Sequence, residues 1–375
     1  MQGLAITNKG IEDIAALEIY GMIKQKAEIR EQCLVFPIEK LEDLCQLCYK
    51  AQSLARVLLL LDSFEINSDL LKEAKQRIDK LSLKEWLHHK KFVVRCIKQD
   101  FEDLSTPEIE GKIGELLLEN SKNNKLKTKV DLREPDIIFL CYLNKNSFYL
   151  GIDFSGYDLS KRHYKIFQHP ETLKGNVAYA LMRIAKYKSG ELLVDPFSGS
   201  GIIAIEAACY AYNFPVNYYM KDKFAFLRLM KFNFNAIDKK IKKHGKHRIF
   251  GFDHNVRYVE SAKKNATIAG VNKYISFSRI AVEWHDTKLE ENSVDVIIGN
   301  PPSASKIVPE KDIRKLYEEL FYQADFIVAK NSRVLLASRD PELAIPAAEK
   351  YKFKVKEKRE IYAGQQLLKV IVFER

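Results

Sequence analysis

The sequence has few cysteines, no long apolar run and no low-complexity tract, and each absence narrows what the protein can be. Six cysteines scattered over 375 residues are too sparse for a disulfide framework and fit a reducing compartment. Cys45 and Cys48 form one isolated pair, which we interpret as apolar helix positions, so no metal site is predicted. No apolar run approaches the roughly 18 residues needed to span a bilayer, and MQGLAITNKG lacks the layout of a signal peptide. We therefore expect a cytoplasmic protein without a membrane partner and, as the simplest state, a monomer.

The chain has, in contrast, a clear excess of positive over negative charge. The formal net charge is +11 and the isoelectric point is near 9.1. Lys and Arg neutralise phosphates and release counterions, so a nucleic acid is the partner that this balance favours. Many lysine-rich proteins are nevertheless only soluble and basic, and charge alone does not decide between the two.

The pattern of apolar residues predicts an α/β protein in several units. Short helices and strands alternate at the start of the chain, which indicates small α+β units at 1–65 and 66–153. Residues 154–171 show no clear period and read as a linker. From 172 to 375, unbroken apolar strands alternate with longer helices, the signature of a doubly wound parallel sheet covered on both faces.

The most specific stretch is LLVDPFSGSGIIAIEAA, in which a strand ends at Asp195 and a glycine turn opens a helix. This arrangement creates a nucleotide pocket at the carboxyl edge of a sheet. Gly199, Gly201 and Ala204 fit the dinucleotide pattern, but that pattern alone is weak. A carboxylate at the strand end suits a cationic amino-acid group and would repel a pyrophosphate, so we predict S-adenosylmethionine rather than NAD.

A second acid, Asp253, ends the strand FGFD and could accept the two ribose hydroxyls of a cofactor. It could equally cap the helix predicted at Asn255–Ala269, and the two roles can coexist. The segment 213–248 between the two strands is basic, with Phe224, Phe226, Phe232 and Phe234 interleaved. Such a segment could stack on bases, but an amphipathic helix with its phenylalanines in the core is the interpretation we favour.

The strand SVDVIIG is followed by Asn300, Pro301, Pro302 and Ser303. The prolines cannot continue a ladder, so the strand stops and Asn300 lies on a stiff turn. An exocyclic amine on a base is a poor nucleophile unless both of its N–H groups are held. The Asn300 side-chain oxygen and the Pro301 carbonyl are two acceptors that can do so, and such positioning contributes on the order of 7 kcal/mol. A base must leave its helix to reach such a site.

DPFSGSG, FGFD and GNPPS together resemble the class I, Rossmann-like methyltransferases that act on amino groups. FVVRCIKQDFEDLSTPEIEGKIGELLLE and the segments around it are similar to THUMP-domain RNA methyltransferases, and length and layout are closest to the tRNA guanine-N2 methyltransferases of the acceptor stem. The resemblance implies an N-terminal ferredoxin-like domain, a THUMP domain that grips the 3′ end of tRNA, and a Rossmann-like domain that binds S-adenosylmethionine.

The resemblance also implies roles for single residues. The catalytic tetrapeptide would be Asn300, Pro301, Pro302 and Ser303. Cofactor contacts would come from Leu173, Asn176, Asp195, Phe197, Ser198, Gly199, Gly201, Asp253, His254 and Asn300. RNA phosphates would be met by Arg95, Lys98, Lys112, Arg162 and Lys165.

The chain departs from the family pattern twice. Ala281 stands where an acid usually contacts adenine, with Glu283 or Asp286 as possible substitutes, and Ser303 replaces the aromatic residue that stacks on the target base. Stacking is worth about 1–3 kcal/mol per base. Methylation of rRNA, methylation of adenine N6, and non-catalytic RNA binding therefore stay open as alternatives, and an NAD enzyme is a more distant one.

Overall fold

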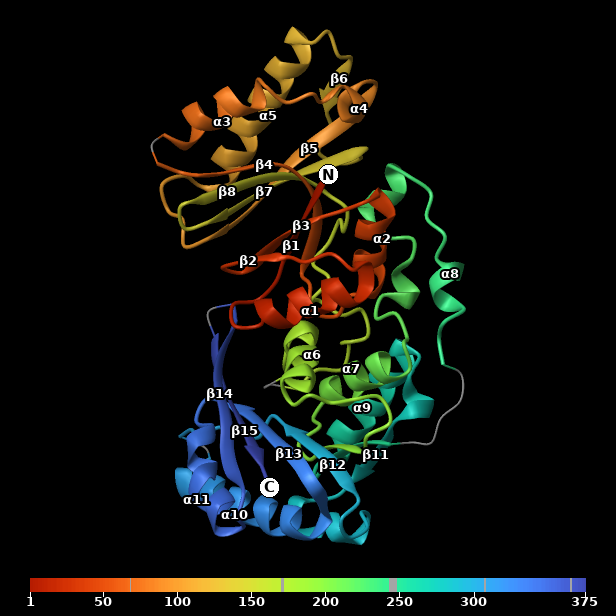
Figure 1. Cartoon of the computed structure of the whole chain (residues 1–375), viewed down its shortest axis with the longest axis vertical. Helices are drawn as coiled ribbons and strands as arrows, with labels where there is room; N and C mark the ends of the chain where they lie inside the picture. The colour runs from red at the N-terminus through yellow and green to blue at the C-terminus, as the bar shows by residue number, and fades with distance from the viewer. Residues whose placement is uncertain (68, 170–171, 243–247, 307, 365) are drawn as a thin grey trace.

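The computed structural model describes residues 1–67, 69–169, 172–242, 248–306, 308–364 and 366–375. Two sheets organise them, one in the N-terminal half and one in the C-terminal half, stacked along the long axis of the molecule (Figure 1). Within these ranges no helix is long and apolar enough to cross a membrane.

The N-terminal sheet has eight strands in the order β2-β3-β1-β4-β8-β7-β5-β6. Its strands are β1 (Gln2–Ile6), β2 (Glu28–Arg30), β3 (Cys33–Pro37), β4 (Arg56–Glu65), β5 (Lys90–Gln99), β6 (Thr128–Val130), β7 (Ile137–Asn144) and β8 (Ser147–Asp153). Its helices are α1 (Glu12–Ile23), α2 (Leu41–Lys50), α3 (Leu70–Ile78), α4 (Lys84–Leu87) and α5 (Thr106–Asn123). Since β4 pairs with β8, the two predicted α+β units share one sheet and one apolar core.

The C-terminal sheet has seven strands in the order β11-β10-β9-β12-β13-β15-β14. Its strands are β9 (Leu193–Asp195), β10 (Ile249–Asp253), β11 (Ser276–Arg279), β12 (Val294–Gly299), β13 (Val328–Ser338), β14 (Lys354–Ala363) and β15 (Gln366–Glu374). The first five in this order are parallel, and β15 and β14 are antiparallel. The order reverses between β9 and β12, and ligands of such sheets bind at that switch point.

Helices cover both faces of this sheet, as the continuous apolar strands predicted. The α-helices are α6 (Gly175–Ile184), α7 (Ile202–Ala211), α8 (Asn235–Asp238), α9 (Val256–Ala269), α10 (Glu310–Ile327) and α11 (Ile345–Lys350). The 3-10 turns are η1 (Tyr218–Met220), η2 (Ala225–Arg228), η3 (Asn272–Tyr274), η4 (Val282–Thr287) and η5 (Pro341–Ala344). One apolar cluster joins α6, α7 and α9 to the sheet, and another joins α10 and α11. The predicted α/β class with α+β units in front of a doubly wound sheet is confirmed.

The described part of segment 213–248 is not the amphipathic helix that we favoured. It forms η1, η2 and the one-turn α8, and it extends from the C-terminal half to pack against α2 (Figure 1). The helix prediction is wrong because short turns, with non-helical backbone between them, replace one continuous helix. The prediction that they are core is confirmed for Phe224 and Phe226, whose side chains are buried.

Candidate functional site

The turn between β9 and α7 is shaped by glycines that admit no side chain. Gly201 has φ +84, and a Cβ there would lie 2.9 Å from the Cβ of Ala262 on α9. Gly251 on β10 is equally constrained, because a Cβ would lie 2.6 Å from the Phe277 ring. These glycines therefore allow the turn and β10 to pack closely against α9 and the Phe277 ring.

Asp195 and Ser198 carry the unsatisfied polar atoms of this turn. Asp195 is 1% exposed, and its Oδ1 accepts a hydrogen bond from the Phe197 amide at 3.2 Å. Its Oδ2 and the buried Ser198 Oγ have no partner among the described residues. Burial raises the pKa of Asp195 well above its usual range, and the nearby Asp253 charge adds to the effect. A buried acceptor of this kind calls for a cationic ligand group.

Asp253 connects the end of β10 to the glycine turn instead of capping a helix. Its Oδ2 accepts from the Gly199 amide at 3.0 Å, and its Oδ1 accepts from the Asn255 amide at 2.8 Å. The N-cap of α9 is Asn255, whose side chain accepts from the Arg257 amide. The alternative in which Asp253 caps this helix is therefore wrong, and Asp253 fixes the glycine turn against β10.

A cavity of about 390 Å³ opens at the carboxyl ends of β9, β10 and β12. It is lined by His169, Pro196, Phe197, Asp253, His254, Tyr258, Ile280, Ala281, Val282, Glu283, Asn300, Pro302 and Leu316. Of the two proposed substitutes for the missing acid, Glu283 is in this lining and Asp286 is not. Its walls are mostly apolar with a few acids, which suits a nucleoside.

A second cavity of about 290 Å³ lies on the other side of the Asn300 turn. It is lined by Thr172, Leu173, Lys174, Asn300, Ser303, Ser338, Arg339, Ala363, Gln366 and Leu368. A small pocket of about 30 Å³ shares lining residues with both cavities, and its lining includes Asp195, Ser198, Gly199, Leu173 and Asn300. Asn300 is the residue that lines all three spaces.

The turn that holds Asn300 is packed tightly against the glycine turn. A Cβ on Gly299 would lie 2.9 Å from the Phe197 ring, so β12 must end in glycine at this point. Pro301 is buried, Pro302 faces the first cavity, and the Ser303 hydroxyl accepts from the Arg339 amide at 3.3 Å. The structure thus brings the predicted tetrapeptide, Leu173, and the residues of the glycine and acid motifs to one edge of the sheet.

Asn176 lies elsewhere, and its predicted contact with a cofactor is contradicted. The side chain is fully buried on α6 and donates to Asn8 Oδ1 at 2.7 Å and, more weakly, to the Ser53 carbonyl at 3.4 Å. Both partners belong to the N-terminal half. The sequence placed Asn176 on the correct helix but could not show which side of that helix it occupies.

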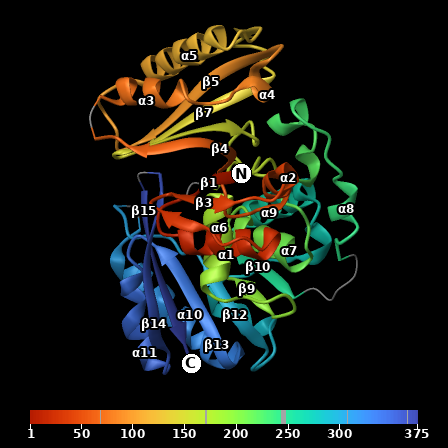
Figure 2. The same cartoon turned by 45° about the horizontal axis from the view of Figure 1, so that its top comes forward.

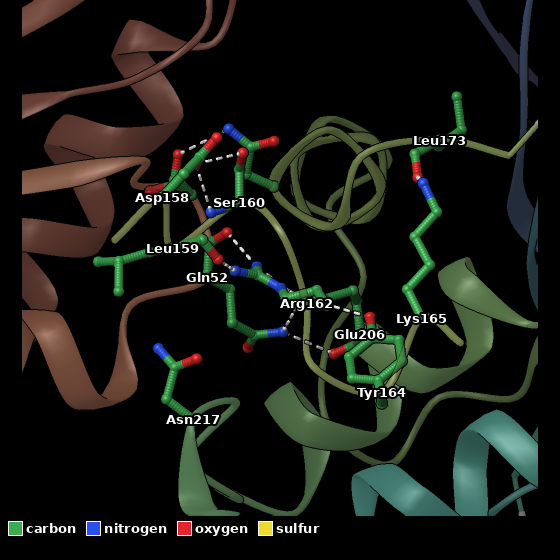
Figure 3. A network of polar contacts seen from close by, with 12 residues as sticks. Gln52, Asp158, Leu159, Ser160, Arg162, Tyr164, Lys165, Leu173, Glu206 and Asn217 are labelled. Carbon is green, nitrogen blue, oxygen red and sulfur yellow. Dashed lines mark hydrogen bonds and ion pairs between the residues drawn. The ribbon is translucent and has the colours of Figure 1, made fainter. Parts of the chain in front are cut away.

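Arg162 is also misassigned, because it is a buried ion-pair residue and not a phosphate contact. Its side chain is 0% exposed; Nε donates to Glu206 Oε1 at 2.7 Å, and Nη2 donates to the Gln52 carbonyl at 2.5 Å (Figure 3). The Tyr164 hydroxyl and the side-chain amide of Gln52 donate to the same carboxylate. Burial opposes the Arg162 charge, but the Glu206 carboxylate outweighs it and raises the Arg162 pKa. The network ties the N-terminal half to α7.

The other cations predicted to meet RNA are partnered but reach the surface. Lys165 donates to the Leu173 carbonyl at 2.9 Å and so supports a wall of the second cavity (Figure 3). Arg95 lies 3.6 Å from Glu110, Lys98 donates to the Leu104 carbonyl, and Lys112 pairs with Glu115. Their contact with RNA stays a prediction.

Several lining residues gave no signal in the sequence. His169 lies over Gly199, where a Cβ would come within 3.3 Å of its ring, and its own ring is edge-on to Tyr258 at 4.4 Å. It belongs to the stretch predicted as a linker. Arg339 reaches the second cavity because β13 runs parallel to β12, and Gln366 reaches it because β15 pairs antiparallel with β13. No local pattern reveals either register.

Comparisons with known proteins identify both halves. Residues 162–369 match the family model described as RMKL-like, methyltransferase domain, and residues 70–153 match the THUMP domain. The tRNA (guanine(6)-N2)-methyltransferase of Methanocaldococcus jannaschii is 30% identical over 372 residues, covering 96% of each chain. The enzyme of the same name from Archaeoglobus fulgidus is 28% identical over 376 residues, covering 98% of this chain and 91% of its own.

Solved structures agree on the fold over the whole chain. TrmN from Thermus thermophilus has a TM-score of 0.73 at 21% identity, covering 100% of this chain and 99% of its own. SMU.472, a putative methyltransferase complexed with SAH, has a TM-score of 0.82 at 21% identity, covering 99% and 97%.

Proposed function

This chain belongs to the RMKL-like methyltransferase family and carries a THUMP domain, and on that premise we propose that it methylates the exocyclic N2 of a guanosine in tRNA with S-adenosylmethionine. The observation that carries the proposal is the position of Asn300, which lines the nucleoside-type cavity, the acidic pocket at Asp195 and the second cavity together. Methyl transfer to an amino group requires a hydrogen-bond acceptor that lies between the site of the methyl donor and the site of the target base.

The first cavity and the small pocket beside it together fit S-adenosylmethionine. In the small pocket, the unpartnered Asp195 Oδ2 and Ser198 Oγ would hold its ammonium group, and the backbone of Gly199 would lie against its amino-acid part. Asp253 would bind the ribose, and the walls near His254 would flank the adenine. When bound, the cofactor supplies a methyl group made electrophilic by its sulfonium.

Residues of the chain would orient the methyl acceptor, which is the guanine amine. The Asn300 side-chain oxygen and the Pro301 carbonyl would hold the two N–H groups of the guanine amine and aim its nitrogen towards the donor. A base flipped out of the RNA would enter the second cavity, whose polar lining includes Ser303, Arg339 and Lys174. Because Ser303 offers no ring, the base would be held by hydrogen bonds and aliphatic contacts rather than by stacking at that position.

The test is methyl transfer from labelled S-adenosylmethionine to tRNA and, separately, to rRNA transcripts, with the modified nucleoside mapped by mass spectrometry. Asn300→Ala should abolish transfer while tRNA affinity stays within about twofold of the wild type. Full activity in this variant would refute the role of Asn300. Modification of rRNA or of adenine N6 alone would replace the proposed substrate, and lack of transfer to any RNA would favour non-catalytic binding.

A further inference from the structure

The second cavity has a wall that the N-terminal half holds in place. Ala363, Gln366 and Leu368, at the turn end of the β14–β15 hairpin, line this cavity together with Asn300. The same end of the hairpin lies beside the start of α1 in two views of the molecule (Figures 1 and 2). The loop between β1 and α1 thus meets the hairpin next to the lining residues.

Asn8 and Lys9 of this loop bind both backbone groups of Tyr362, the residue before Ala363. The Tyr362 amide donates to the Lys9 carbonyl at 2.9 Å, and Asn8 Nδ2 donates to the Tyr362 carbonyl at 2.6 Å. Asn8 Oδ1 in turn accepts from Asn176 Nδ2 at 2.7 Å, which fixes which end of the Asn8 amide faces the hairpin. Asn8 is 9% exposed and Asn176 is fully buried, so water competes little for these bonds.

The neighbouring residues show that this contact requires close approach. Gly10 has φ +92, and a Cβ there would lie 2.1 Å from the Glu360 carbonyl oxygen. Beyond it, Arg359 on β14 pairs with Asp13 on α1 at 2.8 Å. The loop therefore follows β14 over several residues and ends its contact at Tyr362, one residue before the cavity wall.

We propose that Asn8 is a positioning residue for the second cavity: through Tyr362 it sets the place of the hairpin wall against which the target base is held. The N-terminal half would then do more than bind RNA, since it would also complete the geometry of the catalytic half. The role of the cavity as the base site rests on the function proposed above, whereas the coupling of Asn8 to the hairpin does not.

The decisive variant is Asn8→Asp, which keeps the shape of the side chain and the bond from Asn176. An ionised carboxylate cannot donate to the Tyr362 carbonyl and would repel it. At pH 8 we expect hydrogen exchange in peptides spanning 359–364 to accelerate at least tenfold in the RNA-free protein. With saturating tRNA and S-adenosylmethionine we expect kcat to fall at least fivefold, with both dissociation constants within twofold of the wild type.

The matched control is Thr7→Val, one residue earlier in the same loop. It removes the buried hydrogen bond from Thr7 Oγ1 to the Ser53 carbonyl at 2.8 Å, while Asn176 Nδ2 stays as the weaker donor to that carbonyl at 3.4 Å and keeps its bond to Asn8. In this control, both the hydrogen exchange of the hairpin and kcat should stay at their wild-type values. The comparison therefore separates a general loss of stability from a loss of positioning. If Asn8→Asp does not fold, Asn8→Ser, whose hydroxyl is too short to reach Tyr362, provides the same comparison.

Unchanged hairpin exchange in a folded Asn8 variant would overturn the coupling, and accelerated exchange with unchanged kcat would overturn its part in catalysis. A fall in kcat shared by Thr7→Val would also overturn it, because the effect would then be general. If the wild type transfers no methyl group to tRNA, the proposed function fails, but the exchange experiment still decides the coupling.

Discussion

Replacement of Arg162 by methionine tests whether a buried ion pair joins the two halves of the protein. Methionine has a similar length and no charge, so the cavity it leaves is small. The Glu206 carboxylate would remain buried, and among the described residues its remaining side-chain donors are the Tyr164 hydroxyl at 2.6 Å and Gln52 Nε2 at 2.6 Å. The carbonyls of Gln52 and Leu159 would lose a donor as well.

The expected loss of stability follows from the Glu206 charge that stays buried rather than from the contacts of Arg162 that are removed. Removal of one partner from a buried pair costs about 3–5 kcal/mol, since an uncompensated charge is left out of water. Glu206→Gln alone leaves the Arg162 charge buried without its carboxylate, so it should cost a similar amount. The double variant Arg162→Met with Glu206→Gln should be more stable than Arg162→Met by roughly 2 kcal/mol, since no buried charge remains.

The assay is urea denaturation followed separately in each half. The chain has two tryptophans, Trp86 in α4 and Trp284 in η4, so single-tryptophan proteins report one half each. We expect the two transitions to lie closer together in the wild type than in Arg162→Met, because the network that spans the halves is lost. A cost below about 1 kcal/mol, or an equal cost in the Glu206→Gln background, would refute the reasoning.

Two further predictions concern ligands. Asp195→Asn should weaken S-adenosylmethionine binding at least tenfold at pH 8 in calorimetry, since its carboxylate has an unpartnered oxygen suited to a cation; equal affinity would contradict this. Because burial raises the Asp195 pKa, the native state holds the proton more tightly, so stability of the ligand-free protein is present below the ordinary carboxyl pKa and falls as pH rises through the folded pKa. The melting temperature of Asp195→Asn should therefore change less with pH than that of the wild type. Arg95→Ala should reduce the salt dependence of tRNA binding by a slope of about one, whereas Arg162→Met should leave it unchanged while folded.

The cofactor side of the site could be predicted from the sequence because its signals are local. Asp195, Asp253 and Asn300 each follow a short apolar strand, and carboxyl ends of parallel strands meet at one edge. The second cavity could not be predicted in the same way. Its Arg339 and Gln366 are brought to Asn300 by the pairing of β13 with β12 and with β15, and the residue types at these positions do not reveal that pairing.

One signal for the misassigned Arg162 was present in the sequence. Glu206 is the single acid of the helix IIAIEAACYA, and a helix that is apolar all round is buried. A buried carboxylate requires a cation or hydrogen-bond donors as partners, so such partners from elsewhere in the chain were to be expected. Sequence alone does not name that cation, because Arg162 precedes Glu206 by 44 residues in a stretch without a regular period.

Arg162 and Asn176, the two residues whose predicted roles failed, lie at the same junction, and that coincidence has a physical meaning. The sequence pattern divides the chain into an RNA-binding half, a linker at 154–171 and a catalytic half. Arg162 and Tyr164 within it are instead fully buried between the halves, as is Asn176. The distance from the THUMP surface to Asn300 is therefore set by buried polar contacts and not by linker length. It follows that substitutions at this junction should change where on an RNA the enzyme acts, not only how stable it is.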